Sequence, residues 1–213
     1  MPDVSMGVPT PTPFVETSLA TVLFSQMRGY TALAESLPPA RVLSLLEEFF
    51  DVLSTATEAH GGEVFHMASE AMMAGFGLRN PASSGAREAL SAGRTILRLF
   101  ASISSRWQRE HSIVTGIGIG LHFGEVALAE FKGSGSGQGS PTLVGDTTNV
   151  AARLCSRACS GEVLFSSAVA DALGTEGTDF GPIIERPSFL LLPQFALRGR
   201  SALLDIWCAP SPV

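Results

Sequence analysis

Two polar side chains, Asn149 and Arg153, lie four residues apart in the segment Gly145–Arg153. The segment is typical of a turn that opens a helix, and residues four apart share one face of a helix. An amide can donate and accept hydrogen bonds, and a guanidinium can stabilise the charge of a phosphate group. The functional interpretation is therefore hydrogen bonding by Asn149 and stabilisation of phosphate charge by Arg153. The same spacing would also fit an ion pair between Arg153 and a nearby acid.

A second candidate anion site is formed by Arg28, Gly29, Tyr30 and Thr31. These residues precede a predicted helical region, and the free backbone N–H groups at the start of a helix can bind a phosphate. An ordinary helix cap would explain the segment equally well. The glycine-serine segment 132–139 is no P-loop, because no Gly-Lys-Ser/Thr sequence closes it. Its composition is typical of a flexible linker.

Helices and strands in mixed order are predicted to position these groups. Apolar residues recur at intervals of three and four in the expected helices 42–59, 81–107 and the one starting at Thr147. The expected strands are 21–24, 63–67, 71–76, 114–122, 125–131 after a tight turn at Gly124, 142–144, 163–166, 195–198 and 202–207. This order favours an α+β fold. We expect a flexible leader over residues 1–17, one domain over 18–209 and a tail over 210–213.

Composition excludes several classes of protein. Of the 213 residues, 45% are apolar and 16% are charged, which indicates a globular domain and not a disordered chain. The net charge of −6 and the single lysine, Lys132, argue against a nucleic-acid partner. No apolar run reaches the roughly 18–20 residues that span a membrane, and residues 1–13 lack the pattern of a signal peptide. Three cysteines give no disulfide framework, and Cys155 and Cys159 are expected to pack and not to bind a metal. We expect a cytoplasmic protein.

From about Ala20 to Trp207 the chain resembles the catalytic domain of class III nucleotidyl (adenylate/guanylate) cyclases. Besides 145–153, the resemblance rests on the segments 23–31, 65–77, 118–126 and 197–201. Their order and spacing together are specific. The resemblance implies a ferredoxin-like βαββαβ sheet with helices packed on it. It also implies a head-to-tail dimer that binds the nucleotide between its subunits. In this family the ribose 3′-hydroxyl attacks the α-phosphate and releases pyrophosphate.

The resemblance also assigns roles to individual residues. Asn149 and Arg153 match the pair that stabilises the transition state. Gln26 and Glu70 occupy the positions of the two aspartates that bind metal ions. His66 stands where adenylate cyclases carry a base-reading lysine, and Thr142 stands at the position of its base-reading partner.

The metal positions are chemically weakened. Metal-assisted phosphoryl chemistry needs anionic oxygens around hard cations, and the amide of Gln26 brings no charge. Glu70 keeps the charge but its carboxylate moves by about 1.5 Å, the length of one methylene bond. A misplacement of about 1 Å can cost about 100-fold in rate. We therefore expect Gln26 and Glu70 to be polar residues near a cleft, with no cofactor, and Mg²⁺ or Mn²⁺ only if residual activity exists.

His66 is expected to be half-buried beside Met67, although it could still hydrogen-bond a purine edge. The leading hypothesis is a catalytically inactive pseudo-cyclase that acts as a signalling, regulatory or nucleotide-binding module. Two alternatives stay open: the complementary half of a heterodimer, and weak homodimeric activity with manganese. The candidate partners are thus a second copy, a metal-competent cyclase domain and a purine nucleotide. The altered segment 132–139 weakens the expectation of the family's dimer.

Overall fold

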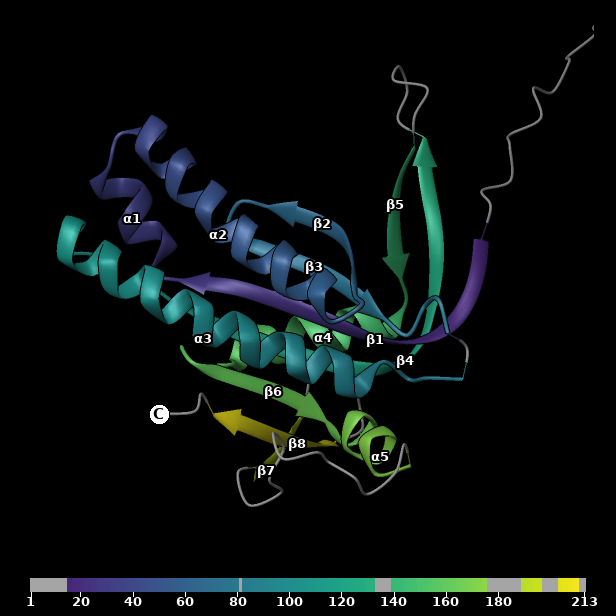
Figure 1. Cartoon of the computed structure of the whole chain (residues 1–213). Coiled ribbons are helices and arrows are strands. Elements are labelled where there is room, and N and C mark those ends of the chain that lie inside the picture. Colours follow the sequence, from purple (N-terminus) through teal and green to yellow (C-terminus); the bar gives the residue numbers. More distant parts are fainter. Residues whose placement is uncertain (1–14, 81, 133–138, 176–188, 197–202, 211–213) are drawn as a thin grey trace, which may run out of the picture.

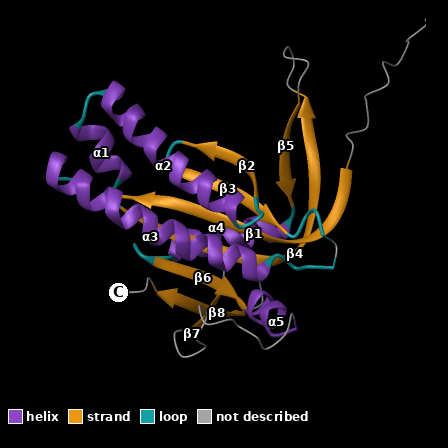
Figure 2. Cartoon of the chain, viewed as in Figure 1, coloured by secondary structure: helices purple, strands orange, loops and turns teal. Residues whose placement is uncertain are grey.

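The computed structural model describes residues 15–80, 82–132, 139–175, 189–196 and 203–210. An eight-stranded mixed sheet forms the centre, in the order β2-β3-β1-β4-β6-β8-β7, with β5 paired to β4. Its first four neighbours, β2-β3-β1-β4, are the strands of a βαββαβ unit. The sheet and its helices are shown in Figures 1 and 2, and they confirm the predicted α+β class.

The elements follow one another in mixed order along the chain. The strands are β1 (Val15–Arg28), β2 (Glu63–Ala68), β3 (Ala71–Phe76), β4 (Gly116–Lys132), β5 (Gly139–Val144), β6 (Glu162–Ser166), β7 (Leu190–Ala196) and β8 (Leu203–Pro210). The helices are α1 (Tyr30–Ser36), α2 (Pro39–Ala59), α3 (Ala86–His111), α4 (Asp146–Arg157) and α5 (Ser167–Thr175). The sequence analysis described no helix over α5.

The two faces of the sheet are covered by different helices. Leu23 and Met27 of β1 belong to the main core, together with the buried faces of α2 and α3. Val22 lies in a second cluster with Ala151 of α4. Because successive side chains of a strand point to opposite faces, Gln26 and Arg28 share the α4 face with Val22. Strand alternation thus directs the predicted metal position away from the main core.

Strand β4 corrects one prediction of the sequence analysis. No tight turn occurs at Gly124; β4 runs without a break through this residue, which pairs with Ala20 of β1. A Cβ atom at position 124 would lie 2.7 Å from the Thr147 hydroxyl oxygen. The glycine therefore makes room for the first turn of α4, and its role is close packing rather than chain reversal.

The linker prediction for residues 132–139 is wrong at both ends of that segment. Strands β4 and β5 form a hairpin arm whose pairing runs from Ala127 with Val144 to Lys132 with Gly139. The arm extends away from the body of the sheet (Figure 1). Residues 133–138 lie outside the described part of the chain. The residues at both ends of this segment therefore form paired strands, although its glycine-serine composition is typical of a flexible linker.

The predicted domain boundaries also shift. Residues 15–17 were assigned to the leader, but they belong to β1 and pair with residues 127–129 of the arm. Pro210 was assigned to the tail, but it is the last residue of β8 and pairs with Glu162. Both segments extend strands whose central residues lie in the apolar core. The segment 197–201 and most of the leader lie outside the described residues.

Alternate glycines of β4 fix the position of α4. A Cβ at Gly118 would lie 2.7 Å from the Ala158 carbonyl oxygen, and one at Gly120 would overlap backbone atoms of Cys155 and Ala151. The helix can lie directly on the strand only because these side chains are absent. The glycine spacing seen in the sequence therefore places the helix that carries Asn149 and Arg153.

We predict that Gly120→Ala destabilises the protein by about 3 kcal/mol, because the new methyl group forces α4 away from β4. Urea unfolding monitored by circular dichroism measures the change. Gly174→Ala is the matched control, since no atom lies within 4 Å of a Cβ at that helical position. The control is expected to be neutral or slightly stabilising. Equal stability of the two variants would contradict the packing role of Gly120.

Candidate functional site

The two predicted metal positions lie side by side and bond to each other. Gln26 is near the end of β1 and pairs with Ala71 at the start of β3. Glu70 lies in the turn before β3, and its carbonyl oxygen accepts a 2.8 Å hydrogen bond from the Met27 amide. The Nε2 atom of Gln26 donates to Oε1 of Glu70 over 3.2 Å. Both side chains are half-buried. The amide and the carboxylate thus satisfy part of each other's hydrogen-bonding capacity.

Arg28 completes this arrangement. Its Nη1 atom donates to Oε1 of Gln26 over 2.7 Å. Its other nitrogens donate to the carbonyl oxygens of Cys155 and Ala158, with Nη2 2.9 Å from the Ala158 oxygen. These carbonyls lie at the C-terminal end of α4, where a positive charge is favourable. We call Gln26, Arg28 and Glu70 the polar triad. It links β1, the β2–β3 turn and α4.

The polar triad is a poor match for the divalent cations that the sequence resemblance implies. The only side-chain oxygen that Gln26 offers already accepts a hydrogen bond from Arg28. The Arg28 guanidinium adds a positive charge, which would repel a dication at short distance. The polar triad thus offers one carboxylate, next to a positive charge, where the sequence resemblance implies two aspartates around the metal ions. Within the described ranges, no three His, Cys, Asp or Glu side chains form a group that could hold a metal ion.

We predict that Arg28→Met destabilises the protein by about 2 kcal/mol. The substitution leaves two carbonyl oxygens of α4 and the Gln26 amide oxygen without their charged donor. Arg28→Lys should recover only part of the loss, because an ammonium cannot reproduce the planar fork of a guanidinium. Thermal unfolding compares the variants. Arg79→Met is the control, because its ion pair with Glu63 is highly exposed, and it should cause no measurable change. An Arg28→Met protein as stable as the native one would contradict this role.

Asn149 and Arg153 lie on the first turns of α4. The hydroxyl of Thr147 donates to the Glu125 carbonyl over 2.6 Å and fixes the start of this helix on β4. Asn149 is exposed and Arg153 is half-buried. Neither side chain forms a hydrogen bond or ion pair with another described residue. The alternative of an ion pair between Arg153 and a nearby acid therefore has no support among the described residues.

The predicted base-reading residues lie on neighbouring strands. His66 of β2 pairs with Met73, and a bulge after Val64 interrupts the register. The sequence analysis expected His66 to be half-buried, but it is exposed. Directly paired residues share a face of the sheet, yet Met73 is buried whereas His66 is exposed. Thr142 is half-buried in β5 opposite Ala129.

The residues of the predicted phosphate-binding segment, 28–31, have different roles in the structure. The Arg28 side chain is bound to the end of α4 and not directed to the start of α1. Gly29 precedes α1 with a φ of 83°, which favours glycine. Tyr30 packs against the main core, whereas Thr31 is exposed. The backbone of residues 29–31 and the exposed side chain of Thr31 are thus left for the predicted phosphate contact.

Sequence reasoning missed the structural role of Arg28. An alternate glycine of β4 makes room for this side chain, because a Cβ at Gly118 would lie 2.6 Å from Nη2 of Arg28. The nearby Cys155 is buried, donates from Sγ to the Gly118 carbonyl, and has a pKa raised to about 11 by burial. It packs as expected, whereas Cys159 is exposed.

Comparison with known proteins gives consistent results. The family model described as the adenylate and guanylate cyclase catalytic domain matches residues 14–185. An uncharacterized protein of Mycobacterium tuberculosis is 30% identical over 157 residues, which are 73% of this chain and 27% of that protein. The chain thus spans about a quarter of the length of this curated relative.

Solved structures show the same fold. The adenylyl cyclase CyaB from P. aeruginosa matches with a TM-score of 0.81 and 22% identity, over 94% of this chain and 97% of that one. A guanylyl cyclase domain from the aquatic fungus Blastocladiella emersonii, described as a non-canonical dimer, matches with a TM-score of 0.69 and 16% identity. That match covers 91% of this chain and 97% of the other. Among the described residues, no helix is both long and apolar enough to cross a membrane.

Proposed function

Because this chain belongs to the family of adenylate and guanylate cyclase catalytic domains, we propose that it is a member that does not cyclise nucleotides on its own. It acts instead as a signalling domain that associates with another cyclase domain or binds a nucleotide without turning it over. The proposal concerns this chain and not the longer proteins to which it is related.

One observation carries the proposal: the hydrogen bonds that join Gln26 to Glu70 and to Arg28. In metal-assisted phosphoryl chemistry the cations lower the pKa of the attacking hydroxyl and neutralise the phosphate charge. The polar triad supplies no comparable set of anionic oxygens, and its guanidinium is held by the end of α4. The site can therefore be stable without a metal, but it cannot activate a ribose hydroxyl in the same way.

Turnover by the purified chain tests the proposal. The protein is incubated with ATP or GTP in the presence of Mg²⁺ or Mn²⁺, and cyclic nucleotide is measured by mass spectrometry. We expect no product above the level of a heat-denatured sample. Clear product formation that disappears in Glu70→Ala would contradict the proposal and would identify a working metal site.

A second candidate function is favoured by the position of Asn149 and Arg153. Their side chains share one face of α4 and make no polar contact with the described residues. They are therefore free to contact a nucleotide bound by a partner subunit that owns both metal-binding aspartates. In this case the chain is the complementary half of a heterodimer, and its own polar triad is not used for chemistry.

Dimer formation is part of both candidates. The hairpin arm of β4 and β5 is present, and it carries exposed apolar side chains such as Val144. Leu19 of β1 and Met67 of β2, two strands that β3 separates in the sheet, are also exposed apolar residues. A structural relative is described as a dimer, which supports the same interpretation here.

A further inference from the structure

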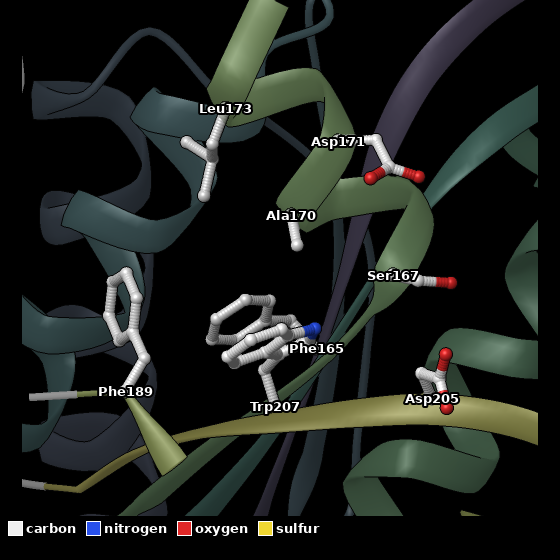
Figure 3. Close-up of a pocket in the computed structure, with 8 residues that line it drawn as sticks. All are labelled: Phe165, Ser167, Ala170, Asp171, Leu173, Phe189, Asp205 and Trp207. Atoms are coloured by element: carbon white, nitrogen blue, oxygen red, sulfur yellow. The ribbon is translucent and has the colours of Figure 1, made fainter. Parts of the chain in front are cut away.

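A cavity of about 390 Å³ lies between α5 and the strands β6 and β8. Figure 3 shows its lining. The lining residues are Phe165, Ser167, Ala170, Asp171, Leu173, Phe189, Asp205 and Trp207. Its size is at the lower end of the range for small-molecule sites, which runs from about 300 to 1,000 Å³.

The cavity is separate from the cyclase-type positions. Phe165 and Leu173 belong to the main core, on the face of the sheet that α2 and α3 cover. Gln26 and Arg28 lie on the opposite face, with α4. A ligand in this cavity would therefore not occupy the place of the nucleotide.

Aromatic side chains form the floor and one wall. Phe165 and Phe189 meet edge to face with their ring centroids 5.2 Å apart, which fixes both rings. The half-buried indole of Trp207 lies beside Phe165 in Figure 3. These rings offer an apolar surface for a flat or alkyl group.

The opposite wall is acidic. Asp171, Ser167 and Asp205 lie on one side of the cavity, across from Phe189 and Leu173 (Figure 3). Among the described residues, the lining includes no Lys, Arg or His. Asp205 already takes part in an interaction, so the exposed carboxylate of Asp171 is the group that would receive a ligand. A carboxylate near an aromatic surface disfavours phosphates and favours a protonated amine, which gains from both carboxylate contact and cation–π attraction.

The position of Arg94 determines the orientation of such a ligand. Its guanidinium lies 5.6 Å from the centroid of the Phe189 ring, so a positive charge is already present at that end. A ligand ammonium is therefore directed to the acidic wall, and its apolar part to Phe165 and Trp207.

From this lining we propose that the cavity binds an organic cation with an aromatic or alkyl body and one protonated amine. The cavity is a second ligand site of the domain, separate from any nucleotide site.

The probe for this site is 2-phenylethylamine, with uncharged 2-phenylethanol as its analogue of similar shape. Binding to the full chain is followed by tryptophan fluorescence, since Trp207 lines the cavity whereas Trp107 is buried among the helices. We expect a saturable change with the amine and at least about tenfold weaker binding of the alcohol, as fits a contact with a charged group. No saturable binding of the amine, or equal binding of both compounds, would overturn the proposal.

Two variants locate the binding to this cavity. Asp171→Asn should weaken amine binding about fivefold, the effect of a partly exposed charge pair, whereas Asp51→Asn on the exposed face of α2 should not. Ala170→Phe should abolish binding by filling the cavity, with circular dichroism as the check on folding. Unchanged affinity in Asp171→Asn or in a folded Ala170→Phe protein would show that the amine binds elsewhere and would overturn the assignment.

Discussion

The triple variant Gln26→Asp, Glu70→Asp and His66→Lys is expected to make cyclic nucleotide at a rate at least about 100-fold above the native chain. The two aspartates place two short carboxylates at neighbouring positions, where the native protein has an amide bonded to a longer carboxylate. Correct placement of such groups within about 1 Å is worth about 100-fold in rate. The lysine adds three donors for a purine edge. Product formation from ATP and GTP, with Mg²⁺ and Mn²⁺, is measured beside the native protein.

A matched control carries Gln108→Asp and Glu58→Asp on the exposed faces of α3 and α2. It reproduces the charge and length changes of the two aspartate substitutions, away from the polar triad, and should stay silent. If the folded triple variant were equally silent, the assignment of Gln26 and Glu70 to the metal positions would be wrong.

The second large effect is the restoration of turnover in a mixture of two proteins. The partner is a cyclase domain that keeps its metal-binding aspartates. It is inactive alone because its own asparagine and arginine are substituted. Native chain should restore turnover in this mixture. Arg153→Ala should then lower the rate by about 100- to 1,000-fold, the usual cost of removing one donor that stabilises transition-state charge. The reason is that Arg153 is presented on α4 without a polar contact to the described residues.

Arg109→Ala on the exposed end of α3 is the charge-matched control and should leave the mixture active. A mixture that gains nothing from the native chain would exclude the complementary-half function. The proposal of a silent domain would remain, because it depends on the polar triad and not on Arg153.

Much of the fold could be predicted from periodicity. The 3.6-residue pattern predicted α2 and α3, and short β-branched or apolar runs predicted β1, β3 and β6, because each of these elements buries one face in a single core. The errors occurred at glycines. Gly124 was assigned to a turn, and Lys132 and Gly139 to a linker, although packing against Thr147 and strand pairing determine their conformations. Such tertiary contacts leave no local signal.

The candidate site could likewise be predicted from the sequence only in part. Residue type alone indicated that Gln26 and Glu70 are poor metal ligands. The sequence could not reveal that Arg28 turns away from the start of α1 and bonds to Gln26, because its other partners are 127 and 130 residues away. A long-range contact of this kind depends on how α4 lies against β4, which only the structure shows.

The most direct test of the account is a Mn²⁺ titration of the native chain, followed by electron paramagnetic resonance, beside the Gln26→Asp/Glu70→Asp variant. The signal of free Mn²⁺ reports binding without any need for turnover. We expect the native chain to leave the signal unchanged and the double variant to reduce it in a saturable manner. Saturable binding of Mn²⁺ by the native chain, lost on Glu70→Ala, would contradict the claim that the polar triad has replaced the metal site.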